Sequence, residues 1–226
     1  MACHGGPDII EDNLVLCLDA GNTKSYPGSG TTWSDLIGSN NGTLINGPTF
    51  SSDDGGVIVF DSTNDYVKCA RNSDFAFGTG DFSISCWYYI TSNNQNQTLF
   101  DTRYNGGTRG LSPYFWNHGF KIWSDGIGGW YSSGETSDLN KWYNMIITRA
   151  GTTFKYYNNA VLNSNILTDV DYNFQDDNFV IGWNYSTQNN KSFGGKIGQV
   201  AVYKGYALTA AEVAQNYNAL KGRFGL

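Results

Sequence analysis

Glutamate and histidine are scarce in this chain. Among its 226 residues, glutamate occurs only as Glu11, Glu135 and Glu212, and histidine only as His4 and His118. Hydrolysis of a glycosidic bond by two carboxylates needs both groups at a fixed separation, for example on a strand with the pattern E-x-D-x-x-E, and no such run is present. The sequence also lacks the Q-x-H strand of a polysaccharide lyase site and the G-x-S-x-G turn of a serine hydrolase. We therefore expect no catalytic residues and a protein that is not an enzyme.

Clusters of basic residues and long apolar runs are missing as well. The 14 lysines and arginines are outnumbered by 20 acidic residues, the net charge is −6, and no two basic residues are adjacent. Nucleic acids and anionic membranes are therefore excluded as partners, because contacts with phosphate need clustered positive charge. No segment approaches the ~20 apolar residues of a membrane span, and residues 1–7 show no signal-peptide pattern, so we expect no secretory signal.

The four cysteines are too few for a disulfide scaffold. Cys17 and Cys86 lie inside apolar runs, where a reduced cysteine packs as a small hydrophobic side chain, and we expect buried free thiols. A Cys17–Cys86 disulfide is the alternative if their two strands are neighbours. Cys3 and His4 have no CxxC partner that would complete a metal site.

What the chain does contain is aromatic and β-branched residues between turn signals. It has 28 glycines, 15 tyrosines, 13 phenylalanines and 7 tryptophans. The segment 82–90 alternates with the two-residue period of a half-buried strand, and Asn158-Asn159 is a hairpin-turn signal. The predicted strands are 14–19, 42–45, 56–60, 66–68, 82–90, 99–103, 111–116, 119–124, 142–149, 152–157, 160–162, 179–182 and 196–203.

One segment near the C-terminus has helical rather than strand spacing. Its apolar residues recur at helical intervals over 209–220, and Thr209 is followed three residues later by Glu212, the spacing of a capping box. Many short strands with one appended helix are typical of a β-sandwich or jelly roll. No linker or change of composition divides the chain, so we expect an N-terminal arm at 1–8 and a single domain at 9–226.

Five groups of segments, in order along the chain, carry a family resemblance. They are 14–21 with 33–36 and 40–44, then 59–61 with 65–67, then D-F-S-I-S-C-W at 81–87, then K-W-Y-N at 141–144, and last 193–203 with 207–213. Together they resemble the laminin G-like family of concanavalin A-like domains, over residues 9–222. The resemblance implies an all-β jelly-roll sandwich of two antiparallel sheets with one short C-terminal helix.

The loop 22–33, N-T-K-S-Y-P-G-S-G-T-T-W, is similar to copies of this family carried by tailed bacteriophages. That similarity implies a non-catalytic virion protein made in the host cytoplasm, which serves as a decoration, fibre or adhesin. Such a protein contacts other virion proteins and can form a homo-oligomer. It binds host-surface glycans or stabilises the particle. A decoration protein without any ligand is the alternative. A glycan-degrading enzyme with a rearranged site is a third hypothesis.

Aromatic residues near polar ones are the candidate carbohydrate-binding residues. Sugar rings stack on exposed aromatic side chains, although in a β domain most such side chains pack in the core. Trp130 and Tyr131 follow a glycine-rich segment, which favours exposure. The candidate set is Trp116, His118, Trp130, Tyr131, Trp183 and Tyr185.

Aspartates supply the candidate ligands for a metal ion. Calcium prefers six to eight oxygen ligands, and it is the one cofactor that this fold suggests. Asp19, Asp61 and Asp65 form the candidate calcium set. The alternative set is a second acidic group on a predicted loop, Asp169, Asp171, Asp176 and Asp177. Such a group is more often a solvent-exposed surface than a metal site.

Overall fold

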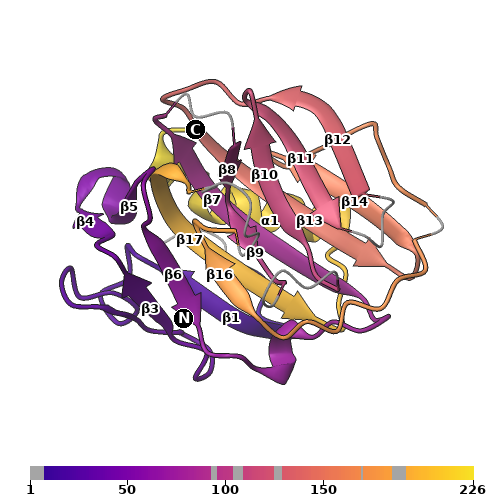
Figure 1. Ribbon diagram of the computed structural model, residues 1–226, viewed down its shortest axis with the longest axis horizontal. Coiled ribbons are helices and arrows are strands. Elements are labelled where there is room, and N and C mark those ends of the chain that lie inside the picture. The colour runs from indigo at the N-terminus through magenta and orange to yellow at the C-terminus, as the bar shows by residue number, and fades with distance from the viewer. Residues whose placement is uncertain (1–7, 93–95, 104–108, 125–128, 169, 185–191) are drawn as a thin grey trace.

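The protein is a sandwich of antiparallel sheets (Figure 1). The computed structural model describes residues 8–92, 96–103, 109–124, 129–168, 170–184 and 192–226, without the side chains of 129 and 130. The back layer is one eight-stranded sheet. In spatial order its strands are β15 (Val161–Leu162), β14 (Thr153–Asn158), β13 (Trp142–Ala150), β7 (Phe82–Ile90), β17 (Gly194–Lys204), β5 (Val57–Asp61) and β4 (Thr49–Ser51), with β1 (Leu14–Asp19) also paired to β17.

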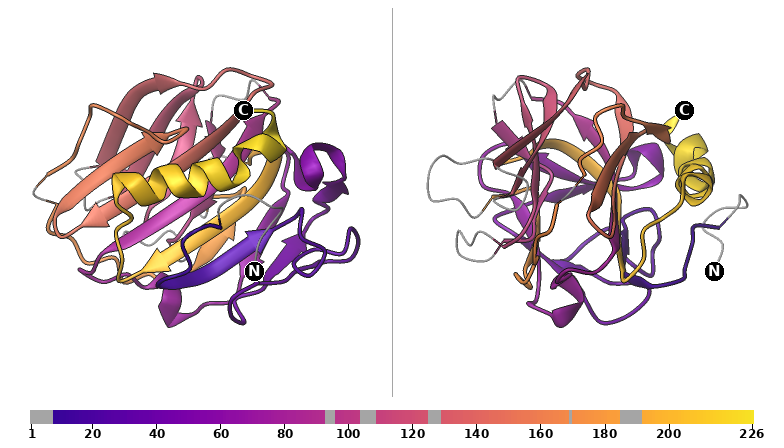
Figure 2. Two further views of the ribbon diagram at one scale, coloured as in Figure 1. Left: turned by 180° about the vertical axis from the view of Figure 1, so that it is seen from behind. Right: turned by 90° about the vertical axis from the view of Figure 1, so that its right-hand side faces the viewer.

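The front layer consists of two smaller sheets side by side (Figures 1 and 2). The first has four strands in the order β12 (Gly129–Thr136), β11 (Gly119–Ser124), β10 (Ser112–Trp116) and β8 (Asn96–Thr98). The second has five, in the order β2 (Thr32–Trp33), β3 (Gly42–Ile45), β6 (Tyr66–Cys69), β16 (Phe179–Ile181) and β9 (Phe100–Asp101). Two short helical turns, η1 (Asp53–Gly55) and η2 (Ser73–Phe75), lie in the connections.

Alternation along the strands builds the core between the layers. In β13, Met145 and Ile147 join the core cluster that faces the front layer, whereas Trp142 and Ile146 point to the other side. This division follows from the strand conformation, because successive side chains of a strand point to opposite faces. The result is an apolar core contributed by all three sheets.

The C-terminal segment covers the outer face of the back sheet (Figure 2). The helix α1 (Ala210–Leu220) begins at the predicted capping box: Thr209 Oγ1 accepts from the Glu212 amide, and the Glu212 carboxylate accepts from the Thr209 amide at 2.8 Å. The turn η4 (Lys221–Phe224) follows directly. The ring of Trp87 stacks on Tyr217 and on Phe224, with centroid distances of 5.5 and 4.4 Å. The cover explains why β7, predicted as half-buried, is buried on both faces.

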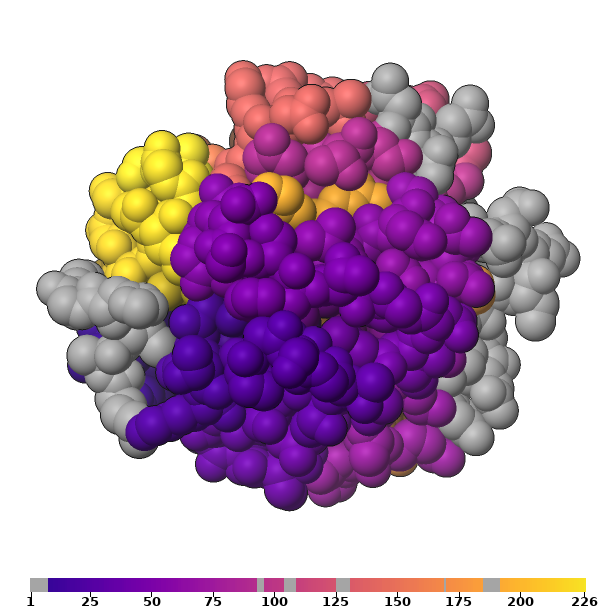
Figure 3. Space-filling model, turned by 90° about the vertical axis from the view of Figure 1, so that its left-hand side faces the viewer, coloured from indigo at the N-terminus to yellow at the C-terminus, as the bar shows by residue number. Residues whose placement is uncertain are grey.

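Segments from the two ends of the chain lie close together. The Asp8 carbonyl accepts from Gln215, the Ile10 amide donates to Asn216, and Tyr203 donates to the Ile10 carbonyl. In the side view of Figure 3, the N-terminal segments fill most of one end of the sandwich, with the C-terminal helix beside them. Residues 1–7 of the predicted arm lie outside the described residues. The longest α-helix in the described part has 11 residues, and none there could cross a membrane.

Several local predictions need correction. The strand β12 was not predicted, because its own sequence G-W-Y-S-S-G-E-T lacks regular alternation. The short strands β2, β4 and β8 were also missed, and only residues 100–101 of the predicted strand 99–103 form a strand, β9. The turn predicted at Asn158-Asn159 is shifted by one residue, since Asn159 and Ala160 carry the positive φ angles of 49° and 63°.

Three of the four cysteines confirm the prediction of buried free thiols. Cys17, Cys69 and Cys86 are all free and buried, and burial raises the pKa of the Cys69 thiol to about 12. The alternative Cys17–Cys86 disulfide does not form: β17 lies between the two strands, and the two side chains belong to clusters on opposite faces of the sheet. Cys3 and His4 lie outside the described residues.

Candidate functional site

Among the side chains that the structure describes, the outer face of the four-stranded front sheet carries Trp116 and Trp123. Residues directly opposite each other in antiparallel strands point to the same face. The pairs Ser112–Trp123, Tyr114–Lys121 and Trp116–Gly119 alternate with pairs whose side chains fill the core. Trp116, Lys121 and Trp123 therefore share the outward face of the sheet.

Trp116 lies at the tip of the β10–β11 hairpin. Its side chain is 43% exposed, and the Lys121 ammonium lies 5.9 Å from its ring centroid. The turn consists of Asn117 and His118, with φ angles of 48° and 66°, the positive values that a tight two-residue hairpin turn requires. His118 is half-buried, and its carbonyl accepts from the Ser137 amide at 2.9 Å. Trp116 and His118 therefore both lie at the tip of this hairpin, at one end of the sheet.

A buried ion pair supports the second tryptophan. Arg103 is 4% exposed and binds the Asp101 carboxylate with two hydrogen bonds, of 2.8 and 2.7 Å. Its guanidinium also donates to Asn184 Oδ1 at 2.8 Å and lies 4.4 Å from the Trp123 ring. Asn184 in turn donates to Ser112 Oγ at 3.0 Å. This network fixes the guanidinium plane against the indole and joins the two front sheets at their boundary.

The network was missed by sequence reasoning. Asp101 and Arg103 are two residues apart, a spacing that puts them on one side of an extended segment. That spacing was visible in the sequence F-D-T-R. Asn184 is 81 positions away along the chain, so only the fold brings it to the guanidinium.

The other predicted aromatic residues divide into three groups. Trp183 is half-buried and packs on Tyr66 of the five-stranded sheet, with centroids 5.8 Å apart. The side chain of Trp130 and the whole of Tyr185 lie outside the described residues. The prediction for Tyr131 is wrong, because its ring is 5% exposed and belongs to the core.

Tyr131 is buried because it lies on the inward face of β12. It pairs with Ile122, and its hydroxyl donates to Asn163 Oδ1 at 3.1 Å and to the Asn165 carbonyl at 2.5 Å. Burial raises the pKa of Tyr131 to about 12. Its ring is therefore a structural element of the sandwich and is closed to a sugar.

The three aspartates of the candidate calcium set do not meet at one site. Asp19 Oδ1 accepts from Arg223 at 2.5 Å near the start of β5, whereas Asp61 and Asp65 lie at its end. Asp65 Oδ2 accepts from the Asp61 amide at 3.1 Å, and burial raises the pKa of the Asp65 carboxyl. Within the described ranges, no three histidine, cysteine, aspartate or glutamate side chains are grouped as a metal site would need. The Asp19–Asp61–Asp65 prediction is therefore wrong as a single site.

The described members of the alternative acidic group, Asp171, Asp176 and Asp177, likewise form no group that could hold a metal ion. Asp177 forms a two-bond ion pair with Arg71, at 2.6 and 3.1 Å, at the surface. Asp169 lies outside the described residues.

The sandwich with its helix-covered back sheet and its outward aromatic front face defines a lectin-like β domain. The chain belongs to the concanavalin A-like lectin/glucanases superfamily: a laminin G model of that superfamily matches residues 61–214, more than half of the chain. No curated protein sequence matches the chain significantly.

Solved structures share the fold at low sequence identity. The binding domain of Paraclostridial Mosquitocidal Protein 1 is 17% identical, with a TM-score of 0.72 over 92% of this chain and 52% of that one. Domain 4 of AbnA, an extracellular arabinanase from Geobacillus stearothermophilus, solved with arabinotriose, is 17% identical, with a TM-score of 0.71 over 91% and 98%. A structure of botulinum neurotoxin type C is 16% identical, with a TM-score of 0.70 over 92% and 51%. The chain thus spans about half of the two toxin chains and nearly all of the arabinanase domain.

Proposed function

We propose that this chain is a non-catalytic carbohydrate-binding module, and that its ligand binds on the outer face of the front sheet around Trp116, Trp123 and Arg103. The observation that carries the proposal is the exposure of Trp116 on the same face as a tryptophan held by a buried arginine network. An indole ring offers an apolar surface to the C–H groups of a sugar ring, and Lys121 beside it can donate hydrogen bonds to hydroxyls.

Two of the similar structures support a glycan as ligand. The arabinanase domain was solved with arabinotriose, and cell entry of botulinum neurotoxin type C depends on interaction with two ganglioside molecules. Their sequences are too distant to transfer a binding residue to this chain, so the proposed surface rests on the geometry of Trp116, Trp123 and Arg103.

Binding to a glycan array tests this proposal. The wild-type chain should bind a defined set of glycans, and Trp116→Ala should weaken that binding at least tenfold, the factor that corresponds to about 1.4 kcal/mol of lost stacking. Val161→Ala is the matched control, because Val161 is also exposed but lies on the edge strand β15 of the back sheet. Absence of binding to every glycan would refute the module, and release of sugar from a bound polysaccharide would refute its non-catalytic character.

A place on a virus particle is the finer part of the proposal. Its support is the similarity of the loop 22–33 to copies carried by tailed bacteriophages. On a particle, the module would contact other virion proteins and present its front face to glycans of the host surface. Antibodies raised against the recombinant chain should label purified particles in electron micrographs. Labelling of host cells alone, with unlabelled particles, would refute the virion assignment and leave the glycan proposal standing.

A further inference from the structure

A cavity of about 220 Å³ lies on the outer face of the back sheet, on the opposite side of the sandwich from the proposed glycan surface. It is enclosed by the first described residues, the strand β1, the loop that follows β1 and the end of α1. Apolar side chains such as Leu14, Leu36 and Leu220 line one part of it, and Asp19 and Gln199 line another. The cavity therefore combines a hydrocarbon wall with a polar end.

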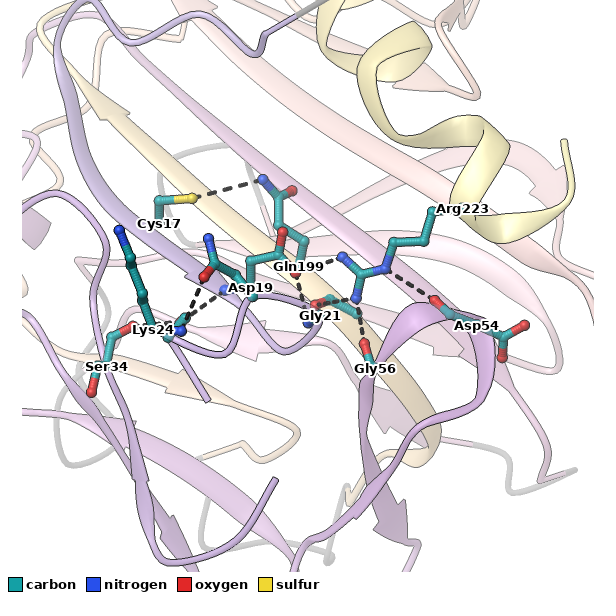
Figure 4. Close-up of polar contacts among 12 residues, drawn as sticks. Cys17, Asp19, Gly21, Lys24, Ser34, Asp54, Gly56, Gln199 and Arg223 are labelled. Atoms are coloured by element: carbon teal, nitrogen blue, oxygen red, sulfur yellow. Dashed lines mark hydrogen bonds and ion pairs between the residues drawn. The ribbon is translucent and has the colours of Figure 1, made fainter. Parts of the chain in front are cut away.

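The polar end is a pair of side chains on neighbouring strands. Asp19 of β1 is directly opposite Gln199 of β17, which places both on one face with Cβ atoms roughly 4.5–5.5 Å apart. Both residues are almost completely buried, at 2% and 3% exposure. Figure 4 shows them side by side, with Cys17 on one side and Arg223 on the other.

Each of the two side chains has an oxygen without a hydrogen-bond donor among the described residues. Asp19 Oδ1 accepts from Arg223 Nη1 at 2.5 Å and from the Gly21 amide at 2.9 Å, but Asp19 Oδ2 accepts from neither. The Gln199 amide nitrogen makes one weak contact, 3.9 Å to Cys17 Sγ, and its carbonyl oxygen accepts no bond there. Both residues line the cavity, so these two oxygens can accept hydrogen bonds from a ligand that donates.

The surroundings hold the pair in place. Arg223 also donates to the carbonyls of Asp54, at 3.0 Å, and Gly56, which keeps its guanidinium on the far oxygen of Asp19. At Gly21 a Cβ atom would lie 2.3 Å from the Gly55 carbonyl oxygen, so this approach of the chain requires glycine. The acceptors are thus arranged before any ligand arrives.

The charge of the lining indicates a cation. Four carboxylates, those of Asp8, Glu11, Asp19 and Asp35, and one lysine, Lys24, line the cavity. The Asp35 carboxylate is occupied by four backbone amides, those of Cys17, Ile37, Gly38 and Asn40. The charge of Arg223 opposes a cation, but that guanidinium sits on the other oxygen of Asp19. Since Coulomb attraction falls with distance, a cation in contact with Oδ2 gains more from the carboxylate than it loses to the guanidinium.

We propose that this cavity binds a primary ammonium group at the end of an aliphatic chain. The ammonium donates to Asp19 Oδ2 and Gln199 Oε1, and the methylene groups pack on the leucines of the wall. The volume is below the roughly 300–1,000 Å³ of sites for drug-sized ligands, which suits a single chain. A free alkylamine and the lysine side chain of a partner protein share this chemistry.

Titration with n-pentylamine, followed by nuclear magnetic resonance of the side-chain amide of Gln199, tests the proposal. Pentylamine should give saturable shifts of that amide and of the backbone amides of Asp19 and Leu36. Pentanol should bind at least tenfold more weakly, because it lacks the charge, and pentanoate should not bind. Equal affinity for amine and alcohol, or no shift with the amine, would overturn the proposal. Binding of N-acetyl-lysine methylamide as tight as that of pentylamine would assign the site to protein lysine; much weaker binding would assign it to free amines.

Two variants make the test specific to the cavity. Ala219 lines the cavity on α1, so Ala219→Phe should fill it and abolish the response to pentylamine. Ala211→Phe is the matched control, because Ala211 is exposed on the same helix away from the cavity, and its response should equal the wild type. If Ala219→Phe does not fold, Gln199→Met removes one acceptor at similar volume and should weaken binding about tenfold, as measured on the backbone amides of Asp19 and Leu36. Wild-type affinity in a folded Ala219→Phe or Gln199→Met protein would contradict the proposed site.

Discussion

Tryptophans lie on the outer faces of both layers, but the two faces differ in what covers them. On the back sheet, Trp87 and Trp142 are buried beneath Phe224 of the C-terminal segment. The centroid of the Phe224 ring lies 4.4 Å from that of Trp87 and 4.3 Å from that of Trp142. On the front sheet, Trp116 is 43% exposed, and the guanidinium of Arg103 lies over the ring of Trp123. The same residue type therefore stabilises the fold on one face and is open to a ligand on the other. What decides between these roles is the cover, which a count of aromatic residues does not reveal.

Removal of the cover should have the largest effect. Phe224→Ala deletes a 4% exposed ring that contacts two tryptophans, and we expect the free energy of unfolding to fall by about 3–5 kcal/mol, the usual cost of truncating a buried phenylalanine. Urea denaturation monitored by circular dichroism measures the change. Glycan binding at the front face should persist at low temperature, where the protein remains folded. A loss below about 1 kcal/mol would contradict the view that this segment stabilises the back face.

A substitution of Arg223 tests how much an ion pair, rather than apolar packing, contributes to holding the C-terminal segment on the back sheet. Its pair with Asp19 joins residues 204 positions apart, and both side chains are nearly buried, at 8% and 3% exposure. Arg223→Gln leaves the Asp19 carboxylate buried without its partner, and the expected loss of unfolding free energy is about 3 kcal/mol. The control is Arg71→Gln, which breaks the exposed pair with Asp177 and should cost less than about 1 kcal/mol. Equal losses in the two variants would show that burial of the Arg223 pair does not matter.

The fold could be predicted from the sequence wherever the local pattern and the tertiary environment agree. The alternation in 82–90 predicted β7 with its bounds, and Thr209 with Glu212 predicted the start of α1. The strand β12 could not be predicted, because Gly129 and Gly134 interrupt the alternation of its residues. Its β-structure depends on pairing with β11. Tyr131 was assigned to the surface for the same reason: without the strand, nothing in the sequence indicates which way the ring points.

The candidate site was predictable only in part. Trp116 and His118 could be identified because they lie at the tip of a hairpin whose two strands are evident locally. The Arg103 network joins Asp101, Asn184 and Ser112 from three separate segments, and such a grouping depends on sheet order. The pairing of Asp19 with Gln199 is equally non-local, since it rests on the register of β1 against β17. Apart from the spacing of Asp101 and Arg103, the sequence contains no local signal for either grouping.

Trp116→Ala should have the smallest effect on stability and completes the comparison between the two faces. Its ring is largely outside the core, so we expect the free energy of unfolding to change by no more than about 0.5 kcal/mol, as for other surface substitutions. Urea denaturation of this variant beside Phe224→Ala gives the contrast directly, because both changes remove one aromatic ring from an outer face. A loss above about 2 kcal/mol for Trp116→Ala would mean that the front tryptophan is a structural residue like those behind the helix. Its effect on glycan binding would then report unfolding rather than lost stacking, and the proposed binding surface would lose its main support.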